Sequence, residues 1–265
     1  MALMDNASHV INERCLQQQR AQRTDCPYIL GDFSARTINH HYFWPSEPRN
    51  RGLPTPREIN VNRIHHVYND TKILVIVRNP AERLFSDYKF YAGSHNNVVT
   101  ADDFHERVVT AVEVWNNCTQ VLRLPENRCA YGTNFPPELP KRGFWSLYSA
   151  DRLRIGIYSI YVINCFKVFP RSHIHVIKLE EFSKNSLTYT ETHLLPFLGL
   201  EPYDASARAH LRRDLARGRV NTNTNHQHEH VKMHARTRRL LDDFYRPYNK
   251  QLSELLNDTK FMWND

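Results

Sequence analysis

The 265-residue sequence predicts an α/β fold, in which a mostly parallel sheet is flanked by helices. Two short runs supply the expected strands, residues 72–77 and 173–179. The first is apolar at every position after Lys72, which suits a strand covered on both faces, as in a parallel sheet. Segments with helical patterns separate and follow the two runs, and this alternation of strands with helices favours parallel pairing.

The helices are expected in the following order. Residues 55–59 start one, with Thr55 as N-cap, Pro56 at the first helical position and Glu58 completing a capping box. Further helices are predicted at residues 1–19, 100–115, 151–169, 205–217 and 234–256. Pro170 stops the third of these, whereas residues 118–145 hold several prolines and are expected to be irregular.

The net charge of +7 favours acidic partners: nucleic acid, an anionic membrane or an anionic polysaccharide. A generically basic protein explains the charge equally well, and no recognisable nucleic-acid motif accompanies it. No apolar run reaches the roughly 18 residues of a membrane span, and polar residues from Asp5 onward argue against a signal peptide. Five cysteines fit neither a dense disulfide scaffold nor a zinc pattern.

The segment from Lys72 to Tyr88 predicts an anion site. Arg78 follows the first strand, Asn79 can cap the next helix, Pro80 suits its first position and Glu82 can complete a capping box. Ser86 lies on the same helical face as Asn79. Open α/β sheets bind ligands at the carboxyl ends of their strands, and a guanidinium binds phosphate in bidentate fashion.

An alternative is equally compatible with the spacing. Arg78 can instead form a structural ion pair with a carboxylate such as Glu82 or Asp87.

Residues 75–88, VIVRNPAERLFSDY, resemble the 3′-phosphate-binding segment of the Golgi carbohydrate sulfotransferases that use 3′-phosphoadenosine 5′-phosphosulfate (PAPS). The family pattern is a strand, Arg, Asp/Asn-Pro, a second Arg, and Ser-Asp-Tyr. The resemblance implies that Arg78 and Ser86 hold the 3′-phosphate. Further segments have family counterparts in the same order: residues 31–45 (near the acceptor), 101–106, 116–118, 128–131, 154–170, 173–182 and 243–249.

The resemblance covers roughly residues 2–265 and implies one sulfotransferase domain over residues 1–265, with the fold of the P-loop kinases. It also implies transfer of a sulfuryl group from PAPS to a sugar hydroxyl of a glycosaminoglycan in the Golgi lumen, without a metal. Within the family, the chain is most similar to enzymes that sulfate the 6-OH of N-acetylgalactosamine 4-sulfate in chondroitin and dermatan sulfate. Heparan sulfate 3-O-sulfotransferases are the next relatives.

A second cofactor segment is implied at Arg217, Gly218, Arg219, Val220 and Asn221, which resemble the family's Lys-Gly-Arg loop over the nucleotide. The two arginines would meet phosphate, and the glycine would allow close backbone approach. The sequence departs from the pattern, because Arg replaces Lys at the start and the following Pro is absent. An exposed Arg-rich helix end is the alternative.

The family's phosphosulfate-binding loop, of the Gly-x-x-Lys-Gly type, has no counterpart in this sequence, and the general-base carboxylate of the family lies upstream of Met1. We therefore expect an N-terminally incomplete domain without its first strand and loop, and assign no catalytic residue. The alternative function is a catalytically inactive relative that binds a polyanion or adenosine 3′,5′-bisphosphate. A nucleic-acid binder, supported by charge alone, is a weaker third.

Several other residues are candidates. Asp32 stands where relatives carry a Glu near the acceptor and can orient substrate, or it is an exposed loop residue. Cys118 and Cys129 match a family cysteine pair, which implies a disulfide and an oxidising lumen. A solvated His-rich loop is expected rather than a metal site at His226, His228, His230 and His234. Glycosylation sequons begin at Asn6, Asn69, Asn117 and Asn257.

Overall fold

The computed structural model describes residues 31–32, 36–41, 43–94, 99–132, 144–216 and 230–263. The chain divides into two compact units, Met1–Thr37 and Ile38–Asp265. The expected helix at residues 1–19 lies outside the described residues. All elements below belong to the second unit.

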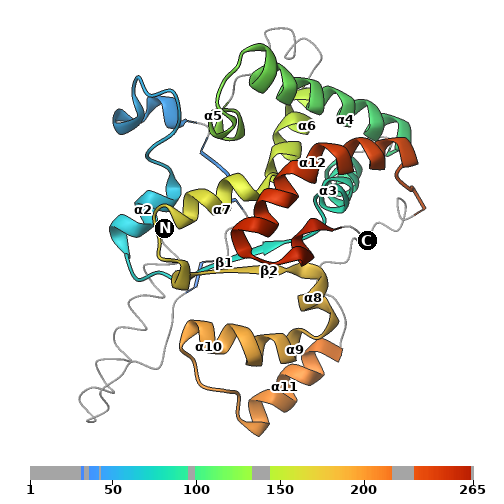
Figure 1. Ribbon diagram of the computed structural model, residues 1–265. Coiled ribbons are helices and arrows are strands. Elements are labelled where there is room, and N and C mark those ends of the chain that lie inside the picture. The colour runs from blue at the N-terminus through green and yellow to red at the C-terminus, as the bar shows by residue number, and fades with distance from the viewer. Residues whose placement is uncertain are drawn as a thin grey trace. The chain divides into compact units, whose positions relative to one another are not determined.

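Two parallel strands form the sheet of the described residues (Figure 1). Strand β1 (Ile73–Val77) pairs with β2 (Ile174–Lys178), with Ile73 opposite Ile174 and Val77 opposite Lys178. This confirms the predicted strands and their parallel pairing. Both strands end at the same edge of the sheet, where β1 leads to helix α3 and β2 leads to α8.

Helices account for most of the remaining described chain. Before β2 these are α2 (Asn60–Val67), α3 (Pro80–Ser94), α4 (Ala101–Asn116), α5 (Glu126–Tyr131), α6 (Phe144–Ile155) and α7 (Tyr158–Phe166). After β2 they are α8 (Leu179–Lys184), α9 (Ser186–Tyr189), α10 (Leu195–Leu198), α11 (Ala205–Ala216) and α12 (Ala235–Leu256). The 3₁₀ turns are η1 (Trp44–Ser46), η2 (Pro48–Asn50), η5 (Arg171–His173) and η8 (Thr259–Met262), and η3 (Asn117–Val121) and η6 (Thr190–Leu194) are π-helical.

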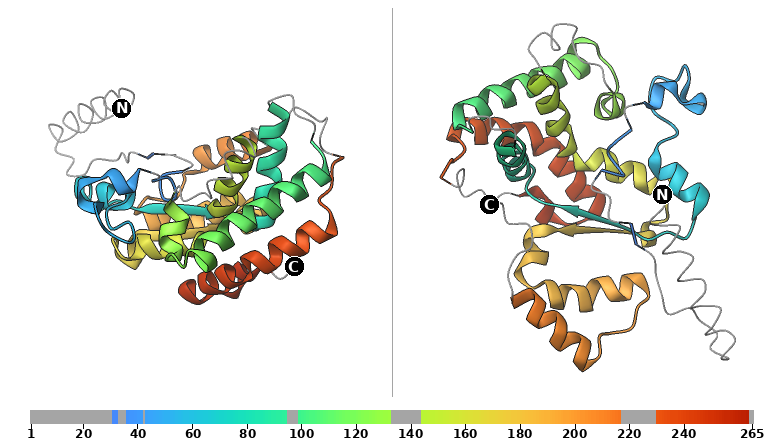
Figure 2. Two further views of the ribbon diagram at one scale, coloured as in Figure 1. Left: turned by 90° about the horizontal axis from the view of Figure 1, so that it is seen from above. Right: turned by 180° about the vertical axis from the view of Figure 1, so that it is seen from behind.

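The main core lies on one face of the sheet. Val75 and Val77 of β1 are buried there, in one cluster with residues of α3, α4, α7 and α12. Helix α12 packs along α7, α3 and α4, as the view from above shows (Figure 2). On the opposite face Ile177 is buried, and the ring of His175 contacts those of Tyr189 and Phe197 from α9 and α10. Helices therefore lie on both faces of the sheet, as predicted, and on the second face they cover β2.

The second face of β1 differs from the expectation. Leu74 is 38% exposed and Ile76 is 58% exposed, so within the described residues the strand is covered on one face rather than two. On this face, the contacts of the short helices after β2 include the ring of His175, which meets Tyr189 and Phe197, and the side chain of Lys72 just before β1, whose Nζ lies 5.5 Å from the centre of the Phe197 ring.

The expected single helix over residues 151–169 is two helices. Helix α6 ends at Ile155 and α7 begins at Tyr158, with Gly156 between them. The hydroxyl of Tyr245 donates a hydrogen bond to the carbonyl of Leu153 at 2.8 Å, and its ring lies directly against Gly156. A residue of α12 thus takes both a carbonyl and the space that a continuous helix would use.

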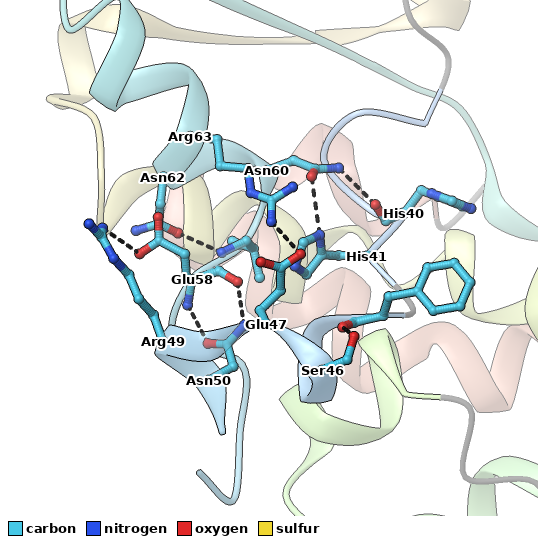
Figure 3. Close-up of polar contacts among 12 residues, drawn as sticks. His40, His41, Ser46, Glu47, Arg49, Asn50, Glu58, Asn60, Asn62 and Arg63 are labelled. Atoms are coloured by element: carbon cyan, nitrogen blue, oxygen red, sulfur yellow. Dashed lines mark hydrogen bonds and ion pairs between the residues drawn. The ribbon is translucent and has the colours of Figure 1, made fainter. Parts of the chain in front are cut away.

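The helix expected from Thr55 begins only at Asn60. The buried side chain of Asn50 accepts a hydrogen bond from the backbone N–H of Glu58 (2.7 Å) and donates one to the Glu58 carbonyl (2.7 Å) (Figure 3). It also accepts a hydrogen bond from the backbone N–H of Arg57 at 2.9 Å. The carbonyl of Glu58 is an acceptor that a helix starting at Thr55 would need for its own backbone bonds. Asn62 then accepts from the N–H of Ile59 at 3.1 Å and caps the later start.

The other helix predictions agree with the structure. Thr100 caps α4 by accepting from the Asp103 N–H at 3.1 Å, and α11 and α12 lie within a residue or two of their expected ranges. The segment 118–145, expected to be irregular, contains α5 as well as the π-helical turn η3.

Candidate functional site

Arg78 lies at the carboxyl edge of the sheet, directly after β1 and two residues before α3. The side chain of Asn79 caps α3, because its Oδ1 accepts from the N–H groups of Ala81 (3.0 Å) and Glu82 (3.2 Å). The strand, turn and helix that the sequence predicts are therefore present, and Arg78 stands at their junction.

The predicted capping box is wrong for Glu82, whereas Asn79 caps α3 as predicted. The carboxylate of Glu82 forms an ion pair with Arg238 of α12 and does not reach back to the turn. Instead, the N–H of Asn79 donates to Oε1 of Glu180, a residue just past β2, at 2.6 Å. A carboxylate from the first turn of α8 therefore replaces the local one.

The carboxylates considered as partners of Arg78 are both occupied by other arginines. Asp87 binds the guanidinium of Arg152 with both oxygens and lies 3.8 Å from a nitrogen of Arg83. Glu82 pairs with Arg238. Within the described ranges, the half-buried side chain of Arg78 has no ion pair or hydrogen bond. The structure therefore does not contain the alternative ion pair between Arg78 and Glu82 or Asp87.

Ser86 follows on the same strand–turn–helix unit as Arg78. The stripe of α3 that faces the core consists of Ala81, Leu84, Phe85 and Tyr88, which are all buried. Ser86 is half-buried, and its side chain makes no hydrogen bond to another described residue. A hydroxyl in this position can donate to a phosphate oxygen.

A buried polar cluster lies behind the turn. The hydroxyl of Tyr158, on α7, is close to the backbone of Arg78, to the guanidinium of Arg83 and to the carboxylate of Glu180. It has no hydrogen-bond partner among the described residues, and neither does Oε2 of Glu180. Burial raises the pKa of Tyr158, so the phenol stays neutral beside these charges.

The second cofactor segment, Arg217 to Asn221, lies outside the described residues; α11 ends directly before it, at Ala216. Asp32 is described and exposed, in the first unit. The roles expected for Asp32 and for Arg217 to Asn221 therefore stay predictions.

The structure describes the histidine segment from His230 onward, so His226 and His228 lie outside the described residues. Nε2 of His234 is 2.9 Å from Oδ1 of Asp102, which also binds Arg236 at 3.0 Å. No group of metal-ligating side chains is found where the structure describes the chain.

Cys118 and Cys129 form a disulfide, as the resemblance implied. The buried guanidinium of Arg154 donates to the carbonyl of Cys129 at 2.9 Å and also to that of Gly132, which ties the closed loop to α6. Cys165 is a free, buried thiol, and burial raises its pKa to about 12.

Sequence reasoning missed a polar network over residues 40–63 (Figure 3). Nδ1 of His41 lies 3.1 Å from Oδ1 of Asn60, whose amide donates to the carbonyl of His40 at 2.7 Å, while Arg63 pairs with Glu47. Burial lowers the pKa of His41. The adjacent histidines were the only local signal, and their partner lies 19 residues further along the chain.

Comparison with known proteins shows which family the chain resembles. A family model described as "Sulfotransferase domain" matches residues 46–248. Carbohydrate sulfotransferase 15 of Rattus norvegicus is 30% identical over 263 residues, which cover 98% of this chain and 43% of the relative. Carbohydrate sulfotransferase 15 of Homo sapiens is 28% identical over 262 residues, with the same coverage of 98% and 43%. The chain thus spans less than half the length of these curated relatives.

Among solved structures, a sulfotransferase from Alicyclobacillus acidocaldarius matches with a TM-score of 0.47 and 21% identity, over 75% of this chain and 60% of that one. The family assignment rests on the family model instead, whose match to residues 46–248 takes in most of the 265 residues and includes β1, α3 and β2. The chain belongs to the family of sulfotransferase domains.

Proposed function

We propose that residues 1–265 form one domain of a PAPS-dependent carbohydrate sulfotransferase. The observation that carries the proposal is the state of Arg78: a half-buried guanidinium at the carboxyl edge of a parallel sheet, whose two nearby carboxylates, Glu82 and Asp87, are bound to other arginines. A cation in this position, without an internal partner among the described residues, suits an anionic ligand.

In this proposal the ligand is the nucleotide end of PAPS. Arg78 and Ser86 bind its 3′-phosphate, the guanidinium through paired charge-assisted bonds and the hydroxyl through a single one. Arg217, Gly218, Arg219, Val220 and Asn221, which follow α11 in the sequence, are proposed as the second set of residues that bind the nucleotide. The donor itself supplies the reactive group: the sulfur forms a bond to the acceptor oxygen as its bond to the bridging 5′-phosphate oxygen breaks. Adenosine 3′,5′-bisphosphate is the leaving group, and the proton of the acceptor hydroxyl passes to water.

The proposed acceptor is a sugar hydroxyl of a glycosaminoglycan, the 6-OH of N-acetylgalactosamine 4-sulfate in chondroitin or dermatan sulfate. The relatives carry the name carbohydrate sulfotransferase, and the net charge of +7 suits a polyanionic acceptor. Asp32 is proposed to orient this acceptor. No metal takes part in the proposed reaction.

The proposed compartment is the Golgi lumen. A disulfide between Cys118 and Cys129 suits an oxidising environment. Of the described sequons, Asn69 and Asn257 are exposed, whereas Asn117 is half-buried inside the π-helical turn η3. Asn6 lies outside the described residues. As a separate observation, none of the described helices has the length and apolarity to cross a membrane.

A second candidate function is binding of adenosine 3′,5′-bisphosphate or a polyanion without sulfuryl transfer. The sequence observation that favours it is that no segment of the 265 residues has the Gly-x-x-Lys-Gly pattern of the family's phosphosulfate loop. Such a loop offers backbone donors and a Lys to the charge that develops as the sulfuryl group leaves.

Two measurements on the 265-residue chain test the proposal. Calorimetric titration with adenosine 3′,5′-bisphosphate and with 5′-AMP should give clearly tighter binding of the nucleotide that carries a 3′-phosphate. Transfer of labelled sulfate from PAPS to chondroitin 4-sulfate then separates the two candidates, because binding without transfer supports the second. Equal affinity for the two nucleotides contradicts a 3′-phosphate site, whether or not the chain transfers sulfate.

A further inference from the structure

The turn that carries Arg78 is held by a residue at the start of α8, the helix that follows the neighbouring strand β2. Glu180 lies two residues past the end of β2, and its Oε1 accepts a hydrogen bond from the backbone N–H of Asn79 at 2.6 Å. This is short for an N–H···O bond, as expected where the acceptor is a carboxylate.

The residues on both sides of Arg78 are therefore fixed. On one side, Val77 is paired with Lys178 of β2. On the other, Asn79 is bound through its N–H to Glu180 and through its side chain to the first turn of α3. The backbone from which the guanidinium extends is thus tied to β2 through Val77, to α8 through Glu180, and to the first turn of α3 through the side chain of Asn79.

The neighbouring carboxylate, Glu181, does not share the contact that Glu180 makes with the N–H of Asn79. Glu181 points to Lys260, whose Nζ lies 3.0 Å from Oε2 of Glu181 and 3.0 Å from Oδ2 of Asp258. Both glutamates lie in the first turn of α8, where a negative charge is favourable in general. Only Glu180 binds the turn before α3, and its second oxygen is buried without a hydrogen-bond partner among the described residues.

We infer that Glu180 is a positioning residue for the 3′-phosphate site. It does not touch the nucleotide; it fixes the Arg78–Asn79 backbone so that the guanidinium meets the phosphate in bidentate geometry. The inference rests on the proposed role of Arg78. It predicts that Glu180 contributes to the preference for nucleotides with a 3′-phosphate, and not only to folding stability.

The readout is the ratio of the dissociation constants of 5′-AMP and adenosine 3′,5′-bisphosphate, measured by calorimetry on the full chain. Glu180→Ala should lower this ratio about tenfold, because a charge-assisted hydrogen bond is lost. Glu180→Gln should retain most of the preference, since its amide oxygen still accepts from Asn79. Glu181→Ala is the matched control and should leave the ratio unchanged.

If Glu180→Ala does not fold, Glu180→Asp replaces it, because that variant keeps the charge but shortens the reach to Asn79; it should also lower the ratio. Each variant is combined with Arg78→Ala. Where Glu180 acts through Arg78, its substitution has no further effect on the ratio in that background.

The outcomes distinguish a failure of the proposed nucleotide site at Arg78 from a failure of the positioning role of Glu180. If Arg78→Ala leaves the ratio unchanged, the proposed nucleotide site is wrong. If Arg78→Ala abolishes the preference but the folded Glu180 variants keep it, the proposed site stands and the positioning role is overturned. A loss that persists equally in the Arg78→Ala background also overturns it.

Discussion

The aromatic ring of Tyr245 occupies the space that a side chain on Gly156 would need. A Cβ atom built on Gly156 would lie 2.8 Å from ring atoms and from the hydroxyl oxygen of Tyr245. Tyr245 is completely buried, so its ring has no free space to move into. The break between α6 and α7 and the position of α12 therefore depend on each other.

Gly156→Ala is accordingly expected to lower the free energy of unfolding by about 1–3 kcal/mol, the usual cost of overpacking a core. Denaturant unfolding measures this change. In a Tyr245→Leu background, the same substitution should cost clearly less, because the ring that it meets is gone. An equal cost in both backgrounds argues against the steric explanation.

Asp87 is expected to be a structural residue of the site rather than a ligand contact. It binds Arg152 with both oxygens, and the two side chains are only 11% and 13% exposed. Asp87→Asn should lower the free energy of unfolding by about 3 kcal/mol, because a buried guanidinium loses its counter-charge. Asp243→Asn, in an exposed pair with Arg246, is the control and should change it by less than about 1 kcal/mol.

The disulfide between Cys118 and Cys129 should contribute about 2–3 kcal/mol to stability, since the cysteines are separated by 11 positions. Thermal unfolding with and without reductant measures the difference, and the Cys118→Ser/Cys129→Ser variant should show none. Non-reducing peptide mapping of secreted protein should recover the two cysteines in one linked pair. Recovery of both as free thiols contradicts the linkage.

The folded protein should lose stability on mild acidification. Burial lowers the pKa of His41 from its ordinary value of 6.5. The unfolded state therefore binds a proton at a higher pH than the folded state does. The contribution is fully present above pH 6.5, and it is lost as the pH falls through 6.5 toward the lowered native pKa.

Unfolding free energies at several pH values between about 5 and 7.5 test this, because the unperturbed histidine titrates in that window. His41→Gln should show a smaller decrease on acidification than the parent chain. Part of the decrease should remain, since burial also lowers the pKa of His105 and of His175. Identical pH dependence in the two proteins contradicts the assignment to His41.

Local sequence patterns predicted those elements that depend on local chemistry. The run before Arg78 is a strand, Asn79 caps α3, and Thr100 caps α4, because each signal involves residues within a few positions of one another. The position of Arg78 at the sheet edge follows from the same local reasoning. The parallel pairing of the two strands followed instead from the alternation of strands and helices along the chain.

Three of the errors share a physical cause, which is a partner that is distant in sequence. Asn50 takes the backbone groups of Glu58 and delays α2, and Tyr245 divides the helix expected over residues 151–169. Glu180 replaces Glu82 at the turn before α3, across 101 positions of sequence. No window of local sequence contains both members of such a pair.

Arg78 is proposed to bind the 3′-phosphate of the nucleotide. The direct measurement is calorimetric binding of adenosine 3′,5′-bisphosphate and 5′-AMP to the parent chain, Arg78→Ala, Arg78→Lys and the control Arg246→Ala, whose arginine lies in an exposed pair with Asp243.

A charge-assisted contact of about 1.5–3 kcal/mol predicts that Arg78→Ala weakens binding of the bisphosphate roughly ten- to a hundredfold. Binding of 5′-AMP should change little. Arg78→Lys should recover part of the loss, because it keeps the charge without the bidentate geometry. If Arg78→Ala discriminates between the two nucleotides as well as the parent chain and Arg246→Ala do, Arg78 does not bind the 3′-phosphate.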